Sequence, residues 1–125
     1  MNFVDKILEQ VKSGKTELEV VADQWSCPTY VVHLAQAMLE LMERDASGVV
    51  HCSSEGVCSW YEFAREIVVD KPMVKVHPVK TCHYPVKANR PSYSPLCKAR
   101  YSVLTGLDMP TWREGLKEYL DKRGV

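Results

Sequence analysis

The chain contains the stretch Ser59-Trp60-Tyr61-Glu62-Phe63-Ala64, which marks the start of a helix. Ser59 and Glu62 lie three residues apart and form a capping box, in which each side chain accepts a hydrogen bond from the other residue's backbone N–H. Cys58 and Phe63 occupy the positions of a hydrophobic staple around this start. We expect Lys71-Pro72 to end the helix. Its buried side is expected to consist of Phe63, Ala64, Ile67 and Val68.

Two further helices are predicted in the N-terminal third of the chain. The first begins at Phe3 and ends before Gly14, because its apolar residues share one helical face. The second begins after Thr29, the expected N-cap, and its apolar residues recur at helical spacing as far as Met42. We expect this second helix to bury the stripe Val31, Leu34, Ala35, Met38, Leu39 and Met42.

A second capping box, formed by Thr111 and Glu114, predicts the start of a C-terminal helix. Apolar residues follow this start at helical spacing, so one side of the helix should dock on the core. These residues are Trp112, Leu116, Tyr119 and Leu120.

Three short strands are predicted between the helices. The first is Leu18 to Val21, and the second lies within Gly48 to Ser53. The third runs from Val74 to Val79, where apolar and polar residues alternate and one face should meet water. The proline-rich stretch from Tyr84 to Pro95 is expected to be a loop.

These elements predict an α/β fold of about four helices and three short strands, in one domain over residues 1–125. Hydrophobic residues make up 46% of the chain and charged residues 26%, which is typical of a globular domain with a core. No apolar stretch approaches the roughly 20 residues of a membrane span, and no signal peptide is recognisable. A cytoplasmic location is therefore expected, with the five cysteines as reduced thiols.

Five motifs follow one another along the chain: Asp23-Gln24, Pro28-Thr29-Tyr30, the stretch at 59–64, Arg90-Pro91 with Ser94, and Trp112-Arg113-Glu114. In this order and at these separations, the chain resembles the C-terminal, substrate-binding half of dTDP-4-dehydrorhamnose reductases, which belong to the extended short-chain dehydrogenase/reductase superfamily. The resemblance covers nearly all of the 125 residues. It implies a small domain that closes over a sugar nucleotide.

The nucleotide-binding half of that family has no counterpart among these residues. The six glycines lie too far apart to form the glycine-rich turn that holds a dinucleotide pyrophosphate. No tyrosine is followed four residues later by lysine, the pair with which this superfamily protonates a carbonyl. We therefore expect no catalytic residue in this chain, and we expect NADPH or NADH to be bound only by a complete enzyme.

The resemblance also implies that the residues of the sugar-nucleotide site lie on loops facing the missing half. These residues are Asn2, Phe3, Asp23, Gln24, Pro28, Thr29 and Arg90. Asn2 could bond the diphosphate, and the guanidinium of Arg90 suits bidentate contact with a phosphate or, alternatively, a structural salt bridge. Asp23 and Thr29 have the alternative of ending a strand and capping a helix. Three other aromatic residues, Trp60, Tyr61 and Trp112, are expected in the core.

The net charge is zero, but the charges are unevenly distributed. Residues 1–70 carry twelve acids and five Lys and Arg, whereas residues 71–107 carry seven Lys and Arg and no acid. Three explanations stay open: a solvated face balanced in space by acidic helices, a site for the pyrophosphate of a nucleotide sugar, or a nucleic-acid surface. No nucleic-acid-binding module is recognisable, so we do not expect nucleic acid as a partner.

Two groups of potential metal ligands occur, one at His51, Cys52 and Cys58 and one at His77, Cys82 and His83. Neither has the two-residue cysteine spacing of zinc knuckles, so no metal site is expected. Cys58 precedes a helix, but no base accompanies it and its staple position favours packing.

Two functions from different classes remain. The first is binding of a dTDP-4-keto-6-deoxy sugar for an NAD(P)H-dependent reductase of dTDP-rhamnose biosynthesis, with a Rossmann-type domain as partner. The second is a non-catalytic interaction module that resembles the regulatory subunit of methionine adenosyltransferase. Without the Rossmann half an apolar surface should be exposed, so we expect docking of such a domain or self-association as a homodimer, with no membrane partner.

Overall fold

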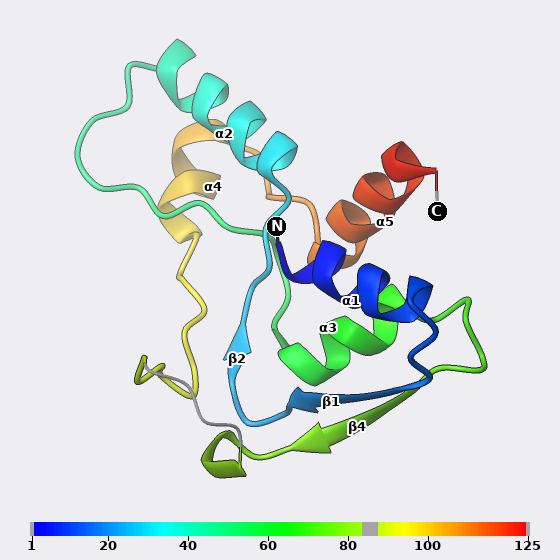
Figure 1. The fold of residues 1–125 in the computed structure, drawn as a ribbon. Helices are drawn as coiled ribbons and strands as arrows, with labels where there is room; N and C mark the ends of the chain where they lie inside the picture. Colours follow the sequence, from blue (N-terminus) through cyan, green and yellow to red (C-terminus); the bar gives the residue numbers. More distant parts are fainter. Residues whose placement is uncertain (1, 84–87, 125) are drawn as a thin grey trace. The chain divides into compact units, whose positions relative to one another are not determined.

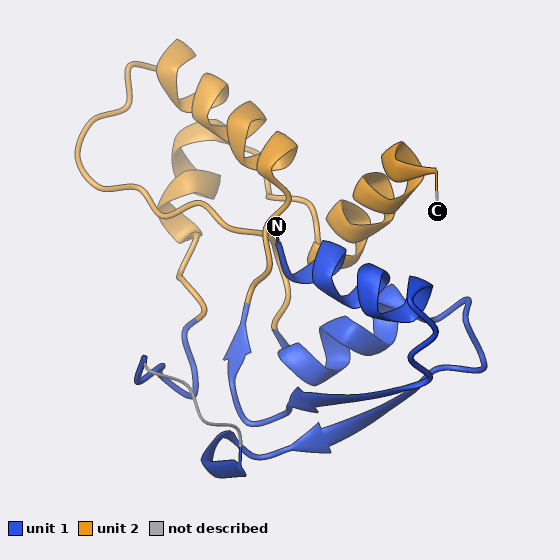
Figure 2. Ribbon diagram, viewed as in Figure 1, with its two compact units in different colours: residues 1–26, 58–94 blue, residues 27–57, 95–125 orange. Residues whose placement is uncertain are grey.

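The computed structural model describes residues 2–83 and 88–124. The chain divides into two compact units (Figure 2). Unit 1 contains residues 1–26 and 58–94, and unit 2 contains residues 27–57 and 95–125. Each unit is therefore assembled from two separate stretches of sequence. The expectation of one domain over residues 1–125 stays a prediction.

Unit 1 is built around a two-stranded parallel sheet that is covered by helices on one face (Figure 1). Strands β1 (Glu17–Val21) and β4 (Lys75–Val79) pair in register from Glu17 opposite Lys75 to Val21 opposite Val79. Helix α3 (Trp60–Ile67) packs against both strands, and α1 (Phe3–Lys12) packs against α3. The unit thus has three layers in the order sheet, α3, α1.

Two very short strands and one helical turn complete unit 1. Strand β2 (Trp25–Ser26) pairs antiparallel with β3 (Cys58–Ser59). A 3₁₀ turn, Thr81–His83, follows β4 directly. The sequence did not predict β2 or β3, because two residues are too few to show an alternating pattern. Of the predicted loop from 84 to 95, residues 84–87 lie outside the described residues, and residues 88–95 contain no helix and no strand beyond one bridge at Tyr93.

The core of unit 1 consists of the apolar faces that the sequence predicts. The strand predicted from Leu18 to Val21 is present as β1, in which Leu18 and Val20 are buried while Glu17 and Glu19 are exposed. The other buried apolar residues of this core are Val4, Ile7 and Leu8 of α1, Phe63, Ala64 and Ile67 of α3, and Cys58 and Val68 on either side of α3.

The capping box at the start of α3 is confirmed. The hydroxyl of Ser59 accepts the N–H of Glu62 at 3.1 Å, and the carboxylate of Glu62 accepts the N–H of Ser59 at 3.2 Å. The helix ends at Ile67, earlier than the expected end at Lys71-Pro72. A turn over residues 68–70 separates the helix from that proline.

Unit 2 consists of α2 (Val31–Glu43), α4 (Ala99–Thr105) and α5 (Trp112–Arg123). Helices α2 and α4 pack together around a cluster that contains Ala37, Tyr101 and Met109. The capping box of α5 is confirmed, because the N–H of Glu114 donates to the Thr111 hydroxyl at 3.2 Å and the N–H of Thr111 donates to the Glu114 carboxylate at 2.8 Å. The sequence did not predict α4.

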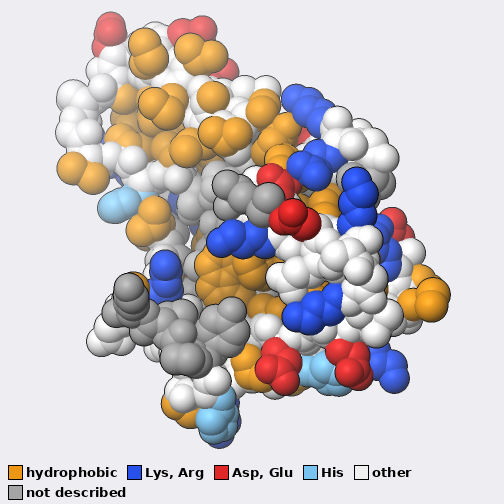
Figure 3. Space-filling view, in the orientation of Figure 1, with side chains coloured by type: hydrophobic (Ala, Val, Ile, Leu, Met, Phe, Trp, Pro, Cys, Tyr) orange, Lys and Arg blue, Asp and Glu red, His pale blue; other side chains and the backbone are white. Residues whose placement is uncertain are grey.

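The predicted buried stripe of α2 is wrong. Of its residues, only Leu34 is partly buried, and Val31, Met38, Leu39 and Met42 are 69%, 55%, 59% and 70% exposed. We call Val31, Ala35, Met38, Leu39 and Met42 the α2 face, and Figure 3 shows hydrophobic side chains gathered over this helix. The helix buries its other side, where Ala37 packs in the cluster with Tyr101 of α4, and where Nε2 of His33 lies 3.0 Å from the carboxylate of Glu118 of α5.

Two local predictions in unit 2 are also wrong. Residues 48–53 form no strand, because no strand of the described residues pairs with them; instead, Arg100 donates to the carbonyl oxygens of Ser47 and Val49, each at 2.7 Å. Thr29 does not cap α2. The N-cap is Tyr30, without a side-chain cap, and the Thr29 hydroxyl donates to the Cys27 carbonyl at 3.0 Å and accepts the Ser54 N–H at 3.1 Å.

The α/β fold class is confirmed, with five α-helices and four short strands in the described residues rather than about four and three. None of the helices that the structure describes is both long enough and apolar enough to span a bilayer.

Candidate ligand-binding site

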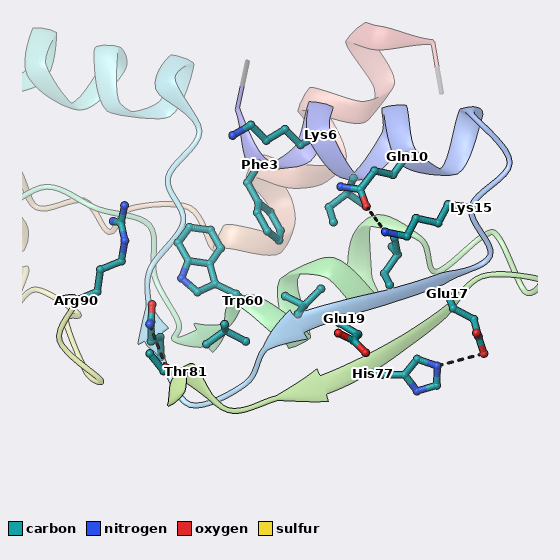
Figure 4. Close-up of a pocket in the computed structure, with 15 residues that line it drawn as sticks. Phe3, Lys6, Gln10, Lys15, Glu17, Glu19, Trp60, His77, Thr81 and Arg90 are labelled. Atoms are coloured by element: carbon teal, nitrogen blue, oxygen red, sulfur yellow. Dashed lines mark hydrogen bonds and ion pairs between the residues drawn. The ribbon is translucent and has the colours of Figure 1, made fainter. Parts of the chain in front are cut away.

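Unit 1 contains a cavity of about 720 Å³. Most of its lining residues belong to α1 and β1 (Figure 4). The first residue of α3, one residue of β4 and the segments that follow β1 and β4 complete the lining. Ile7, Leu18 and Val20 contribute buried apolar surface to it. Its other lining residues are mostly polar or aromatic, so the cavity can offer both stacking surface and hydrogen bonds to a ligand.

Phe3 and Trp60 form an aromatic wall of this cavity. Their ring centroids lie 4.8 Å apart, with the ring planes inclined by 49°, and Figure 4 shows the two rings side by side. Phe3 also stacks on Phe63, at 5.7 Å and 17°. Because Trp60 is the first residue of α3, the capping box at Ser59 fixes the backbone from which its ring projects.

Three cations line the same cavity, namely Lys6, Lys15 and Arg90. Lys6 lies three residues after Phe3 and therefore on the same side of α1. Arg90 comes from a segment that is attached to β2, since the N–H of Trp25 donates to the Ser92 carbonyl at 2.8 Å and the N–H of Ser94 donates to the Trp25 carbonyl at 2.9 Å. Among residues 2–83 and 88–124, none of these three cations forms an ion pair with an acid.

Thr81 joins Asp23 and Gln24 in a hydrogen-bond network at the cavity. The backbone N–H of Thr81 donates to the two carboxylate oxygens of Asp23 at 3.0 and 3.2 Å, and the Thr81 hydroxyl donates to Oδ1. Nε2 of Gln24 donates to the same hydroxyl at 3.1 Å. The hydrogen bond from the Thr81 side chain, followed by that from its backbone, lowers the pKa of Asp23 below the usual value. The network therefore ties the segment after β1 to the 3₁₀ turn after β4.

At the end of the cavity away from Arg90, polar side chains already contact one another (Figure 4). Glu17 lies 3.5 Å from Nε2 of His77, and Lys15 donates to the side-chain oxygen of Gln10 at 3.3 Å. Lys15 is thus held by a hydrogen bond to another side chain, whereas Lys6 and Arg90 form no such bond within the described residues and are the cations best placed to bind an anionic ligand.

The structure brings three of the seven predicted site residues together, since Phe3, Gln24 and Arg90 all line the cavity. Asp23 lies next to Gln24 in the chain, but its carboxylate is occupied by Thr81. Asn2 is the N-cap of α1, where its side-chain oxygen accepts the N–H of Asp5 at 2.9 Å. The remaining two, Pro28 and Thr29, belong to unit 2 and do not line the cavity.

Sequence reasoning missed Trp60, Lys6 and Thr81 among the lining residues. Trp60 was assigned to the core, although it is only partly buried and lines the cavity. Its position directly after a capping residue was a usable signal, as was the spacing of Lys6 from Phe3. For Thr81 the sequence held no signal, because its role depends on the pairing of β1 with β4, which are far apart in the chain.

An aromatic wall, two available cations and a buried amide together suit a nucleoside diphosphate. Bases stack on aromatic rings, and Arg and Lys bind phosphate oxygens through charge-assisted hydrogen bonds. Among the described residues, no three His, Cys, Asp or Glu side chains gather as metal ligands would. The fold and the cavity thus define a small α/β ligand-binding domain.

Known proteins resemble this chain along nearly its whole length. A family model described as the RmlD substrate binding domain matches residues 1–124. The spore coat polysaccharide biosynthesis protein SpsK of Bacillus subtilis is 40% identical over 123 residues, which are 98% of this chain and 42% of that protein. A dTDP-4-dehydrorhamnose reductase of Clostridium acetobutylicum has a TM-score of 0.91 at 39% identity, over 100% of this chain and 45% of that one.

The dTDP-4-dehydrorhamnose reductase of Bacillus anthracis, solved in complex with NADP, gives a TM-score of 0.90 at 36% identity, over 98% of this chain and 43% of that one. The chain belongs to the family of RmlD substrate-binding domains, as the sequence motifs indicated. It spans less than half the length of these relatives.

Proposed function

We propose that the chain binds the dTDP-4-keto-6-deoxy sugar on which dTDP-4-dehydrorhamnose reductases act. The observation that carries this proposal is the cavity of unit 1, in which an aromatic wall lies beside two available cations. Phe3 and Trp60 stack the thymine base, and Lys6 and Arg90 bind the diphosphate. The family membership supports the same ligand class.

Hydride transfer to the bound sugar requires a second, Rossmann-type domain that holds NADPH or NADH. The 125 residues contain neither the glycine-rich turn for a dinucleotide nor a tyrosine followed four residues later by lysine. In this proposal the chain supplies binding and orientation of the sugar nucleotide, and the complementary domain supplies the cofactor and the proton donor. The pair works in the cytoplasm.

The α2 face is the surface to which the complementary domain docks. Four of its side chains are more than half exposed, and the residues of the face carry no charge. Large exposed apolar patches mark interaction sites. The relatives are more than twice as long as the matched region, so each has further chain that could cover such a face. When the chain is alone, the same face makes it self-associate as a homodimer.

Calorimetric titration of dTDP into the purified chain tests the proposed ligand. We expect measurable binding, and Arg90→Ala should weaken it roughly 10- to 100-fold, because a charge-assisted hydrogen bond to phosphate is lost. Arg65→Ala is the matched control. Arg65 does not line the cavity, and its guanidinium lies 5.6 Å from the ring of Tyr61, so dTDP binding should not change.

The alternative is a non-catalytic interaction module, and the exposed α2 face is the observation that favours it. The same titration separates the two functions. If millimolar dTDP produces no heat with the folded wild-type chain, the sugar-nucleotide proposal is wrong and the interaction module is preferred.

A further inference from the structure

We infer that Gln24 recognises the pyrimidine base through its side-chain oxygen, and that Thr81 is the positioning residue that turns this oxygen toward the ligand. The inference rests on the proposed function, because it needs the nucleotide in the cavity of unit 1. It adds a specificity: the chain selects bases that present an N–H donor at N3, such as thymine and uracil, and rejects cytosine.

The orientation of the Gln24 amide follows from a count of protons. The carboxylate of Asp23 has no proton and accepts three hydrogen bonds from Thr81, two from the backbone N–H and one from the hydroxyl. The hydroxyl has a single proton, which this last bond uses. Toward Gln24 the hydroxyl can therefore only accept, and the group that it accepts from is the NH₂ at Nε2, 3.1 Å away.

The opposite end of the amide is then fixed as an acceptor. With Nε2 held by Thr81, Oε1 is the other polar atom of the Gln24 side chain, and no hydrogen bond to it is formed within residues 2–83 and 88–124. Gln24 lines the cavity, and only 8% of the residue is exposed. A ligand that fills the cavity must bring a donor to this oxygen, or leave it buried without a partner.

The nature of that donor follows from the aromatic wall. Phe3 and Trp60 line the same cavity and offer a surface for a planar base, whose edge then carries the hydrogen-bonding groups. Thymine and uracil carry N–H at N3, whereas N3 of cytosine is an acceptor that would face Oε1. A site whose buried polar group is left unpaired by the wrong ligand discriminates strongly against that ligand.

The test compares dUDP with dCDP, two nucleotides that have the same sugar and phosphates and differ in the base at N3 and C4. Calorimetric titration of the full wild-type chain should show dUDP binding at least roughly 10-fold more tightly than dCDP. Thr81→Val removes the hydroxyl but keeps the size of the side chain. The amide is then free to turn over, and the ratio of the two affinities should fall toward one.

Thr81→Ser is the matched control, because it keeps the hydroxyl and should keep the preference for dUDP. Gln24→Met, which removes the acceptor but nearly keeps the length, should abolish the preference as well. A role confined to stability would lower the unfolding midpoints of these variants without changing the ratio. If Thr81→Val does not fold, the comparison of wild type with Gln24→Met decides.

The outcomes separate this inference from the proposed function. Equal binding of dUDP and dCDP by the wild type, with dTDP still bound, overturns base recognition by Gln24 and leaves the sugar-nucleotide proposal standing. An unchanged dUDP preference in folded Thr81→Val overturns the role of Thr81. If none of the three nucleotides binds, the proposed function itself fails.

Discussion

Unit 1 and unit 2 differ in whether their amphipathic elements bury their apolar side chains. In unit 1, α3 covers the sheet and α1 packs against α3, so the apolar positions of β1 and α3 are buried where the sequence predicts burial. In unit 2, the α2 face is exposed while the same helix buries His33 and Ala37. An amphipathic pattern therefore identifies the apolar face of a helix or strand. Whether that face is buried depends on which other elements of the chain pack against it.

The two units also differ in the function proposed for each. The cavity with its cations and aromatic wall lies in unit 1. Unit 2 offers apolar side chains instead, and burying each of them on a partner would contribute about 1.5–3 kcal/mol. Ligand binding is thus proposed for one unit and docking for the other, and three predictions test this division.

The largest effect is expected from Leu18→Ala. Leu18 is 1% exposed in the core of unit 1, so its truncation leaves a cavity and should lower the free energy of unfolding by about 2–5 kcal/mol. Val103→Ala is the control, because Val103 is 83% exposed and lies outside the α2 face, and it should cost less than about 0.5 kcal/mol. Urea denaturation followed by circular dichroism measures both. Equal losses would mean that the burial of Leu18 does not stabilise unit 1.

The second prediction concerns self-association through the α2 face. A charge in the middle of an apolar contact is costly, so Leu39→Lys should weaken dimerisation at least roughly 10-fold, as measured by size-exclusion chromatography with light scattering. Val69→Lys is the control, because Val69 is 72% exposed but belongs to unit 1. A wild-type chain that stays monomeric at high micromolar concentration would contradict the prediction.

The smallest effect is expected from Asp23 and depends on pH. Its pKa is lowered in the folded chain, first by the Thr81 hydroxyl, so its contribution to stability is complete above the ordinary value of 3.8 and is lost as the pH falls through the folded pKa. Denaturation midpoints between pH 6 and roughly pH 2 should therefore fall less steeply in Asp23→Asn than in the wild type. Asp121→Asn in α5 is the control. Parallel pH profiles for Asp23→Asn and the wild type would show that Thr81 does not stabilise the carboxylate.

Local signals predicted much of the fold. The capping boxes at Ser59 and Thr111 gave the starts of α3 and α5, because both partners of each box lie within four residues of one another. By contrast, β2 and β3 arise only where Trp25 meets Ser59, far away in the chain, and residues 48–53 have strand-forming composition but no strand beside them. Pairing of distant segments is what the local pattern could not supply.

The candidate site divides in the same way. Phe3, Gln24 and Arg90 were identified through family motifs, and all three line the cavity. Thr81 was missed, because its hydrogen bonds to Asp23 and Gln24 join residues more than fifty positions apart. Trp60 was missed for another reason: large aromatic residues are commonly buried, and this one lines a cavity instead.

The pairing of β1 with β4 leaves Pro78 on the outer edge of the small sheet. Lys75 donates its N–H to the Thr16 carbonyl, and Val79 accepts the N–H of Ala22, so residues 75, 77 and 79 of β4 face β1 while residue 78 faces away. A proline there offers no N–H to an incoming chain. The β4 edge therefore disfavours the addition of a strand from another molecule, which is a first step of fibril growth.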